Sequence, residues 1–164
     1  MVILGIDPGI ATIGYGLIKK EPRTKESKND NFRCLEYGTI QTSLKLSSPQ
    51  RLERIFIDLA LLIKKHKPSL LAVESLYFFK NIKTALPVSQ AKGVILLAAA
   101  LEKIPVLEFT PLQVKMTITG YGKAEKKQIQ KMISVLLRLK DIPKPDDAAD
   151  ALGVAICGAL AVKK

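Results

Sequence analysis

A change of hydrophobic pattern near residue 48 constrains the fold of this chain more than any other feature. Before it, apolar segments at residues 2–6, 12–18 and 32–42 follow one another without a helical segment, which predicts three sequential antiparallel strands. After it, helical periodicity alternates with apolar runs at residues 69–74 and 106–109, which predicts parallel crossover connections. We therefore expect an α/β fold with a mixed five-stranded sheet flanked by helices.

The periodicity also predicts where the helices lie. They are expected at residues 48–67, around 87–102, directly after Pro111, at 124–139 and at 147–162. Ser48 is predicted to cap the first of them, with Pro49 in its first turn. Residues 19–31 contain no apolar side chain that could be buried, so a solvated hairpin loop or a partly disordered segment is expected there.

Size, charge and cysteine content narrow the class of protein. A length of 164 residues predicts a single domain over residues 1–164. The excess of 26 Lys and Arg over 15 Asp and Glu gives a net charge of +11, which favours a polyanion, and foremost nucleic acid, as the partner. The longest apolar run, Val94–Leu101, is too short to cross a bilayer, so no membrane contact and a cytoplasmic location are expected. Cys34 and Cys157 are expected to be buried free thiols.

Acidic residues in apolar surroundings are the strongest pointers to chemistry. Asp7 ends the first predicted strand, Glu74 ends the fourth, and Asp147 and Asp150 begin the last helix. Strand ends in an open α/β sheet meet at one crevice, and residues three apart share a helix face. Because gathered carboxylates repel one another, we expect divalent cations that prefer oxygen, Mg²⁺ or Mn²⁺, to bind there.

Each acid also has a structural interpretation. Asp7 precedes Pro8-Gly9 and could be a turn former, and Glu74 could be a charge near the start of the next helix. Asp146 is expected to cap the last helix, although a spacing of four would also let it join Asp150. Each signal is weak when taken singly, but their joint occurrence in a basic protein favours a metal site.

A basic stretch surrounds the Gly120-Tyr121-Gly122 turn, and an aromatic run follows Glu74. The lysines repeat every four residues at 123, 127 and 131, which suits contact with a phosphate backbone, although a solvated helix face would look the same. The aromatic run would stack on unpaired bases if exposed, or pack in the core. The residues expected to bind DNA are Tyr77, Phe78, Lys80, Lys115, Lys123, Lys126, Lys127 and Lys131.

Four motifs carry a family resemblance. They are GIDPGIATIGYG at residues 5–16, AVESLYFFKN with SQAKG at 72–93, VKMTITGYGKAEKKQIQ at 114–130 and DDAADALGVAI at 146–156. In this order they resemble the RuvC crossover-junction endodeoxyribonucleases of the ribonuclease H-like superfamily, over nearly the whole chain from Ile3 to Ile156.

The resemblance implies roles for particular residues. The four metal-binding acids of the family fall on Asp7, Glu74, Asp147 and Asp150, with two Mg²⁺ per subunit and Mn²⁺ able to substitute. The family's lysines near the cleaved strand fall on Lys115 and Lys126, and its base-stacking aromatic falls on Tyr77, with Phe78 as the second choice.

The resemblance also implies an activity and partners. A homodimer would bind a four-way Holliday junction during DNA recombination and repair and nick two strands symmetrically, leaving 5′-phosphate and 3′-hydroxyl ends. The dimer contact is expected through the apolar helix at residues 90–101, and a RuvA/RuvB-type branch-migration complex is the further expected partner.

Two other functions remain open at this point. The first motif also resembles the phosphate loop of actin-like ATPases, but that fold needs two such subdomains and about twice this length. The second alternative is a non-catalytic module that binds junctions through the basic surface while the acids serve only structure.

Overall fold

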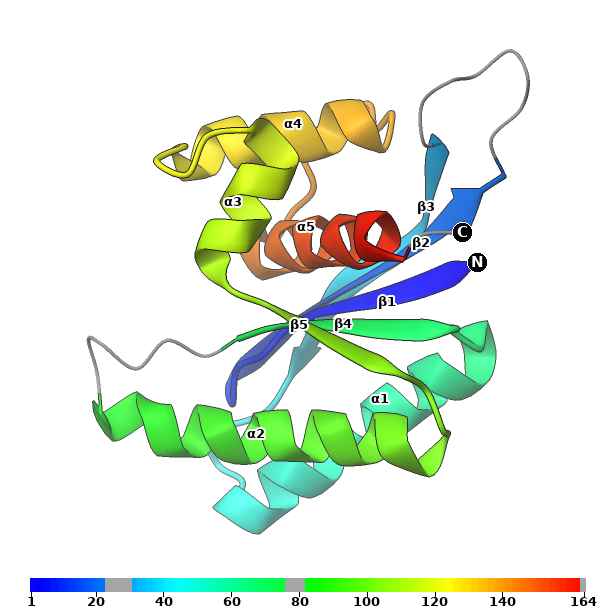
Figure 1. The fold of residues 1–164 in the computed structure, drawn as a ribbon. Coiled ribbons are helices and arrows are strands. Elements are labelled where there is room, and N and C mark those ends of the chain that lie inside the picture. Colours follow the sequence, from blue (N-terminus) through cyan, green and yellow to red (C-terminus); the bar gives the residue numbers. More distant parts are fainter. Residues whose placement is uncertain (23–30, 76–81, 163–164) are drawn as a thin grey trace.

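A mixed five-stranded sheet forms the centre of the described part of the molecule (Figure 1). The computed structural model describes residues 1–22, 31–75 and 82–162, without the side chains of residues 82–84. The strand order is β3-β2-β1-β4-β5; the first three strands pair antiparallel, and β4 pairs parallel with both β1 and β5. The predicted fold class is therefore confirmed.

The described residues form ten helices and strands. In chain order they are β1 (Val2–Asp7), β2 (Thr12–Glu21), β3 (Asn31–Gln41), α1 (Ser48–His66), β4 (Leu70–Glu74), α2 (Ile82–Leu101), β5 (Val106–Phe109), α3 (Pro111–Thr119), α4 (Lys126–Leu136) and α5 (Asp146–Ala161).

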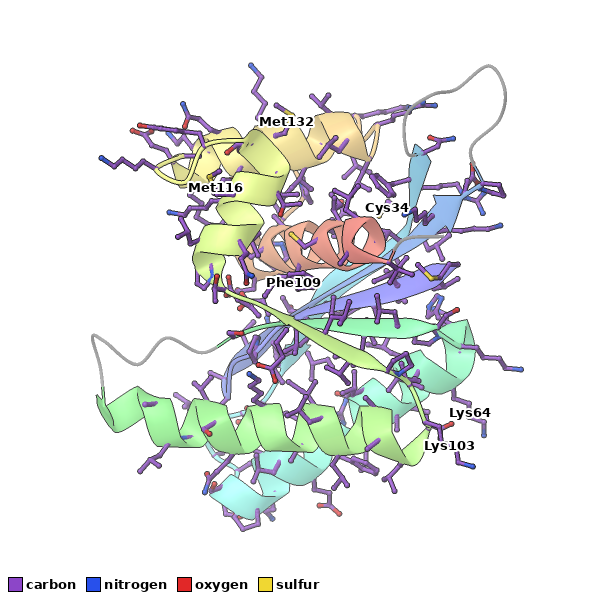
Figure 2. The ribbon with its side chains drawn as sticks, in the orientation of Figure 1. Cys34, Lys64, Lys103, Phe109, Met116 and Met132 are labelled. Atoms are coloured by element: carbon purple, nitrogen blue, oxygen red, sulfur yellow. The ribbon has the colours of Figure 1, made fainter. Side chains whose placement is uncertain are left out.

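Helices cover both faces of the sheet. In Figure 1, α1 and α2 lie on one face, and α5 lies on the other with α3 and α4 stacked over it. Side chains fill both interfaces, so the sheet separates two apolar clusters (Figure 2). Ile3 and Ala72 belong to the α5 side, whereas Leu4 and Leu71 belong to the α1 side. Central strands β1 and β4 are thus buried on both faces, as continuous apolar runs require.

Several predicted helix ends are wrong by a few residues. Ser47, not Ser48, is the N-cap of α1, and its N–H donates to Gln50 Oε1 over 2.9 Å. Helix α2 begins at Ile82 rather than near Pro87, because one missing backbone donor near the start of a 20-residue helix is outweighed by packing. Helix α4 is shorter than expected, and Arg138 beyond its end has a left-handed backbone with φ of 52°.

The polar segment and the cysteines also differ in part from expectation. Strands β2 and β3 extend to Glu21 and from Asn31, so both ends of the expected loop are paired strand, and residues 23–30 lie outside the described part. Both cysteines are free; Cys157 is buried, but Cys34 on β3 is only half-buried at the edge of the α5-side cluster (Figure 2). None of the helices described is long and apolar enough to span a bilayer.

Candidate active site

Asp7 and Glu74 end neighbouring parallel strands on the same face of the sheet. In the register of β1 and β4, Ile6 pairs with Val73, so Asp7 and Glu74 are the next residues of the two strands. Ile6 and Val73 pack into the cluster on the α1 side. Because successive side chains alternate between faces, Asp7 and Glu74 point to the side of α5.

Two glycines of the first motif allow α5 to approach these strand ends. A Cβ atom at Gly14 on β2 would overlap the carbonyl oxygen of Asp147, and a Cβ at Gly5 on β1 would overlap that of Ala151. Only glycine leaves room for a helix backbone at this distance. The first turns of α5, which carry Asp147 and Asp150, therefore lie against the ends of β1 and β2.

The electrostatics reflect this gathering of acids. Burial raises the pKa of Asp7, and the negative charges of Glu74, Asp150 and Asp147 raise it further, to about 8. Burial and the charge of Asp150 also raise the pKa of Glu74, although a hydrogen bond with Asp7 opposes this. Burial likewise raises the pKa of Asp150, against the effect of Lys126. The pocket therefore favours either a retained proton or a bound cation.

Lys126 on α4 places a positive charge next to these acids. Its Nζ donates to Asp150 Oδ2 over 3.0 Å and lies 3.3 Å from Asp146 Oδ2. Burial by itself lowers the pKa of Lys126, but the bonds and attraction to Asp150 and Asp146 outweigh it, so this pKa is raised. Lys126 thus neutralises part of the carboxylate charge and holds Asp150 toward α4.

Asp146 does not have the predicted role. The N-cap of α5 is Pro145, and Asp146 is the first helical residue. Its Oδ1 accepts a 3.0 Å hydrogen bond from Nε2 of Gln130, which is buried on α4. This bond and the ammonium of Lys126 lower the pKa of Asp146. Asp146 therefore joins α5 to α4, and the expectation of a capping side chain is wrong because α4 supplies its partners.

A cavity of about 240 Å³ opens beside the acids, between α3, α4 and the first turns of α5. Glu74, Asp150, Lys115 and Lys126 line it together with apolar residues of α3 and α4. Lys123 and Lys127, also predicted to bind DNA, are exposed and do not line it. Tyr77, Phe78 and Lys80 lie outside the described residues.

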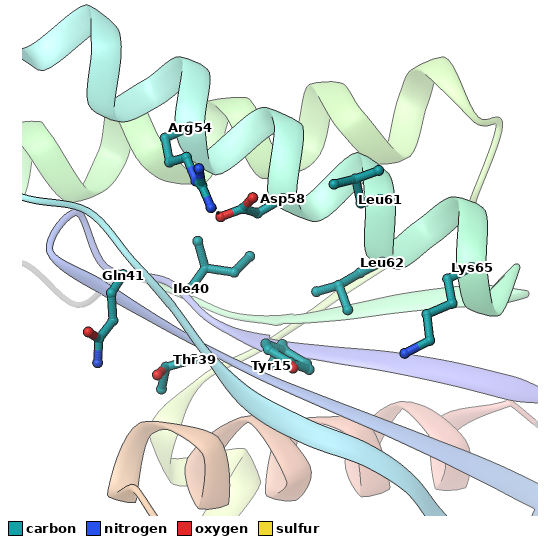
Figure 3. Close-up of a pocket in the computed structure, with 9 residues that line it drawn as sticks. All are labelled: Tyr15, Thr39, Ile40, Gln41, Arg54, Asp58, Leu61, Leu62 and Lys65. Carbon is teal, nitrogen blue, oxygen red and sulfur yellow. Dashed lines mark hydrogen bonds and ion pairs between the residues drawn. The ribbon is translucent and has the colours of Figure 1, made fainter.

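A larger groove of about 480 Å³ lies on the opposite face of the sheet (Figure 3). It runs between α1 and the strands β2 and β3, and Tyr15, Arg54, Asp58 and Lys65 are among its lining residues. Asp7 and Glu74 point away from this face, so the groove is separate from the gathered acids.

The chemistry of the donor set fits a hard divalent cation. Four carboxylates supply only oxygen, which Mg²⁺ and Mn²⁺ prefer, and the pKa of Asp7 shows that they crowd one another. Within residues 1–22, 31–75 and 82–162, no three Asp, Glu, His or Cys side chains form a cluster that could hold a metal ion as they stand. Asp150 is bonded to Lys126 instead, which agrees with the lack of such a cluster.

Two interactions in the described part of the chain were not predicted from the sequence, that of Gln130 with Asp146 and that of Glu108 with Lys92. Gln130 follows Lys126 by four residues, so helical spacing could have placed both on the face toward α5. Glu108 on β5 accepts from Lys92 on α2 over 2.5 Å and lies 3.4 Å from the hydroxyl of Ser75. No sequence signal links Lys92 and Glu108, because their pairing depends on how α2 crosses the sheet.

Topology and site together define a class of protein. Three antiparallel strands followed by two parallel strands, with acids at the ends of β1 and β4 and on the last helix, are the arrangement of a ribonuclease H-like nuclease. The family model described as crossover junction endodeoxyribonuclease RuvC matches residues 3–158. The chain therefore belongs to the RuvC family of crossover junction endodeoxyribonucleases, as its motifs predicted.

Individual relatives agree with this assignment. The crossover junction endodeoxyribonuclease RuvC of Alkaliphilus metalliredigens is 51% identical over 97% of this chain and 93% of its own length. The solved structure of Thermus thermophilus RuvC is 33% identical, with a TM-score of 0.88 over 97% of this chain and 93% of that protein. A structure of T. thermophilus RuvC in complex with a Holliday junction substrate matches at 30% identity, with a TM-score of 0.86 over the same shares.

Proposed function

We propose that this protein is a metal-dependent endodeoxyribonuclease that resolves four-way Holliday junctions by paired symmetric nicks. The observation that carries the proposal is the position of Asp7, Glu74 and Asp150, which lie near enough at the ends of β1 and β4 to raise one another's pKa values, in a protein of net charge +11. Membership of the RuvC family, together with the junction complex of the Thermus relative, supports the choice of substrate.

In this proposal Asp7, Glu74, Asp147 and Asp150 hold Mg²⁺, two ions per subunit, and Mn²⁺ can substitute. Bound divalent cations supply a coordinated water of lowered pKa and charge neutralisation at the phosphate. The acids fix the cations at the end of the sheet, and half-burial of their carboxylates limits competition from water. The products expected are a 5′-phosphate and a 3′-hydroxyl.

Lys115 and Lys126 line the cavity beside the acids, so they are the side chains placed to meet the phosphate that is cut. Asp150 already occupies one donor position of the Lys126 ammonium, and a phosphate oxygen can bind at another, because an ammonium has three donors. The two lysines therefore bind and orient the backbone of the cleaved strand.

The lysines outside the cavity contribute to DNA affinity rather than to strand cleavage. Lys123 before α4, and Lys127 and Lys131 on it, are exposed outside the cavity and can follow the phosphates of a duplex arm. Stacking of Tyr77 or Phe78 on unpaired bases, and a contact of Lys80 with DNA, stay predictions from the sequence.

A homodimer is also part of the proposal. The outward face of α2 carries three large apolar side chains that are more than half exposed, Leu86, Leu97 and Leu101. Exposed leucines along one helix face favour an interface, and a second copy would bury them. The proposed contact runs along α2 and includes residues 90–101, the segment for which the sequence predicts a dimer contact. Sedimentation that shows only monomer at micromolar concentration would contradict it. Association with a RuvA/RuvB-type complex and a cytoplasmic location also stay predictions.

The decisive experiment compares a synthetic immobile four-way junction with a linear duplex of matched sequence. Each is incubated with Mg²⁺, with EDTA, and with the Asp150→Asn variant. Paired symmetric nicks that appear only with the junction, the metal and the unaltered protein support the proposal. Tight junction binding without cutting in Mg²⁺ would favour the non-catalytic module instead, and nucleotide hydrolysis without DNA cleavage would favour the ATPase.

A further inference from the structure

The turn that directly follows Asp7 is held by a threonine that comes after β3. This turn, residues 8–11, connects β1 to β2. Thr42, the residue after β3, donates its backbone N–H to the carbonyl of Ala11 over 3.0 Å and its hydroxyl to the carbonyl of Ile10 over 2.5 Å. Thr42 is only 8% exposed, so these bonds are protected from competition with water.

Arg51 on α1 sets the direction of the threonine hydroxyl. Its Nε donates to Thr42 Oγ1 over 2.8 Å. A hydroxyl has one proton, and the bond from Arg51 occupies one of its acceptor positions, so the hydroxyl proton is directed to Ile10. A charged donor strengthens such a chain of bonds. Arg51, Thr42 and the carbonyl of Ile10 thus form a relay from α1 to the turn after Asp7.

The second feature of Arg51 is an unused donor. Its Nη2 is shielded from solvent and has no hydrogen-bond partner in the described part of the chain. An unpaired buried donor of a charged group is costly, and a native structure tolerates it where the group has another task. The bond to Thr42 is the task that the structure shows for this guanidinium.

We propose that Arg51 and Thr42 are positioning residues, which fix the turn after Asp7 and thereby the direction in which the Asp7 carboxylate meets a divalent cation. In this proposal the two residues act through the protein, without contacting the cation or the DNA. Arg51 acts on Thr42, and Thr42 acts on the backbone of Ile10 and Ala11. The inference rests on the proposed function, because it concerns how Asp7 is presented to the metal.

The test uses variants that separate the hydroxyl from the shape of the side chain. Thr42→Val keeps the shape and removes the hydroxyl, Thr42→Ser keeps the hydroxyl, and Arg51→Met removes the donor to it. Arg54→Met is the matched control, since Arg54 lies one turn further along α1, is exposed, and pairs with Asp58 over 2.8 Å in the groove of Figure 3. Thermal melting in EDTA establishes that each variant is folded.

Three measurements report on the relay. Hydrogen–deuterium exchange of residues 8–12 in EDTA reports the turn without any metal. Calorimetric binding of Mn²⁺ and the Mg²⁺ concentration for half-maximal junction cleavage report the presentation of Asp7. Thr42→Val and Arg51→Met should exchange faster at residues 8–12 and need about 3–10-fold more metal. This is less than the roughly 10–100-fold loss for residues bonded directly to a metal ligand, because Arg51 and Thr42 act through the backbone of the turn. Junction binding in EDTA should not change, and Thr42→Ser and Arg54→Met should behave like the unaltered protein.

Several results would overturn the inference. Folded Thr42→Val with unaltered exchange and metal dependence would do so, as would a Thr42→Ser variant as impaired as Thr42→Val. If Thr42→Val does not fold, Arg51→Met decides, because it leaves the threonine in place. Should the unaltered protein bind no divalent cation, the proposed function fails, and the exchange at residues 8–12 still shows whether the relay holds the turn.

Discussion

Charge on Asp7 should destabilise the metal-free protein, and replacing it with asparagine should remove that cost. Folding raises the pKa of Asp7 from 3.8 to about 8, because burial and the charges of Glu74, Asp150 and Asp147 disfavour its ionised form. The folded protein therefore keeps a proton that the unfolded chain loses. The stability that this proton contributes is full below about pH 4 and is lost as the pH rises through about 8.

The size of the effect follows from the shift. Four pKa units at about 1.4 kcal/mol each amount to roughly 6 kcal/mol for Asp7 taken alone. Asp7 and Glu74 titrate as a pair, so part of this free energy belongs to Glu74. We expect Asp7→Asn to raise the free energy of unfolding by about 2–5 kcal/mol at pH 8 in EDTA, and to raise the melting temperature by roughly 2–4 °C per kcal/mol.

Urea denaturation and thermal melting in EDTA at pH 5, 7 and 8.5 test this prediction by giving the free energy of unfolding and the melting temperature. The stability of the unaltered protein should fall across this range by more than that of Asp7→Asn, and Mg²⁺ should restore it only when Asp7 is present. Asp141→Asn, which removes a charge from an exposed acid outside the site, serves as the control. Equal melting temperatures of Asp7→Asn and the unaltered protein at pH 8.5 in EDTA would refute the reasoning.

Three further predictions concern other parts of the site. Gly14→Ala should destabilise the protein by about 1–3 kcal/mol or more in urea denaturation, because the new Cβ would overlap the backbone of α5. Gly93→Ala is the control, since open space surrounds Gly93, and it should not destabilise the protein. Lys126→Met should lower the melting temperature at pH 8 in EDTA by an amount that corresponds to about 0.5–1 kcal/mol. The effect is small because the Lys126 side chain is half exposed and water screens its attraction to Asp150. An unchanged melting temperature would show that Lys126 does not neutralise the acids. Junction binding should weaken steeply with salt, and Lys123→Ala with Lys127→Ala should reduce the log–log slope by about 1 per lysine, whereas an unaltered slope would place the DNA elsewhere.

The fold was predictable because its signals are local. Apolar runs that end at Asp7 and Glu74, and the alternation of strand and helix after residue 48, depend only on neighbours in the sequence. They predicted which strands are antiparallel and which are parallel, whereas the position of β4 beside β1 came from the structure. The errors fall at element ends, such as the cap of α1 and the start of α2. There, one hydrogen bond or one proline decides the boundary, and packing elsewhere in the fold can outweigh it.

The residues that surround and adjust the acids were harder to predict from the sequence. The role of Asp146 was misjudged because its partners, Lys126 and Gln130, come from α4 and reach it only when α4 packs on α5. The relay from Arg51 to the turn after Asp7 joins α1, the end of β3 and the β1–β2 connection, and no spacing in the sequence indicates that these segments meet.

The sequence by itself determined the fold class, the family and the identity of the acids, because each of these is written in motifs and periodicities along the chain. Only the tertiary structure decided which cation opposes the acids, how far burial raises the pKa of Asp7, and which neighbours hold its turn. Those properties arise from distances and solvent exclusion between segments remote in sequence, and they exist only after β1, β4, α4 and α5 have come together.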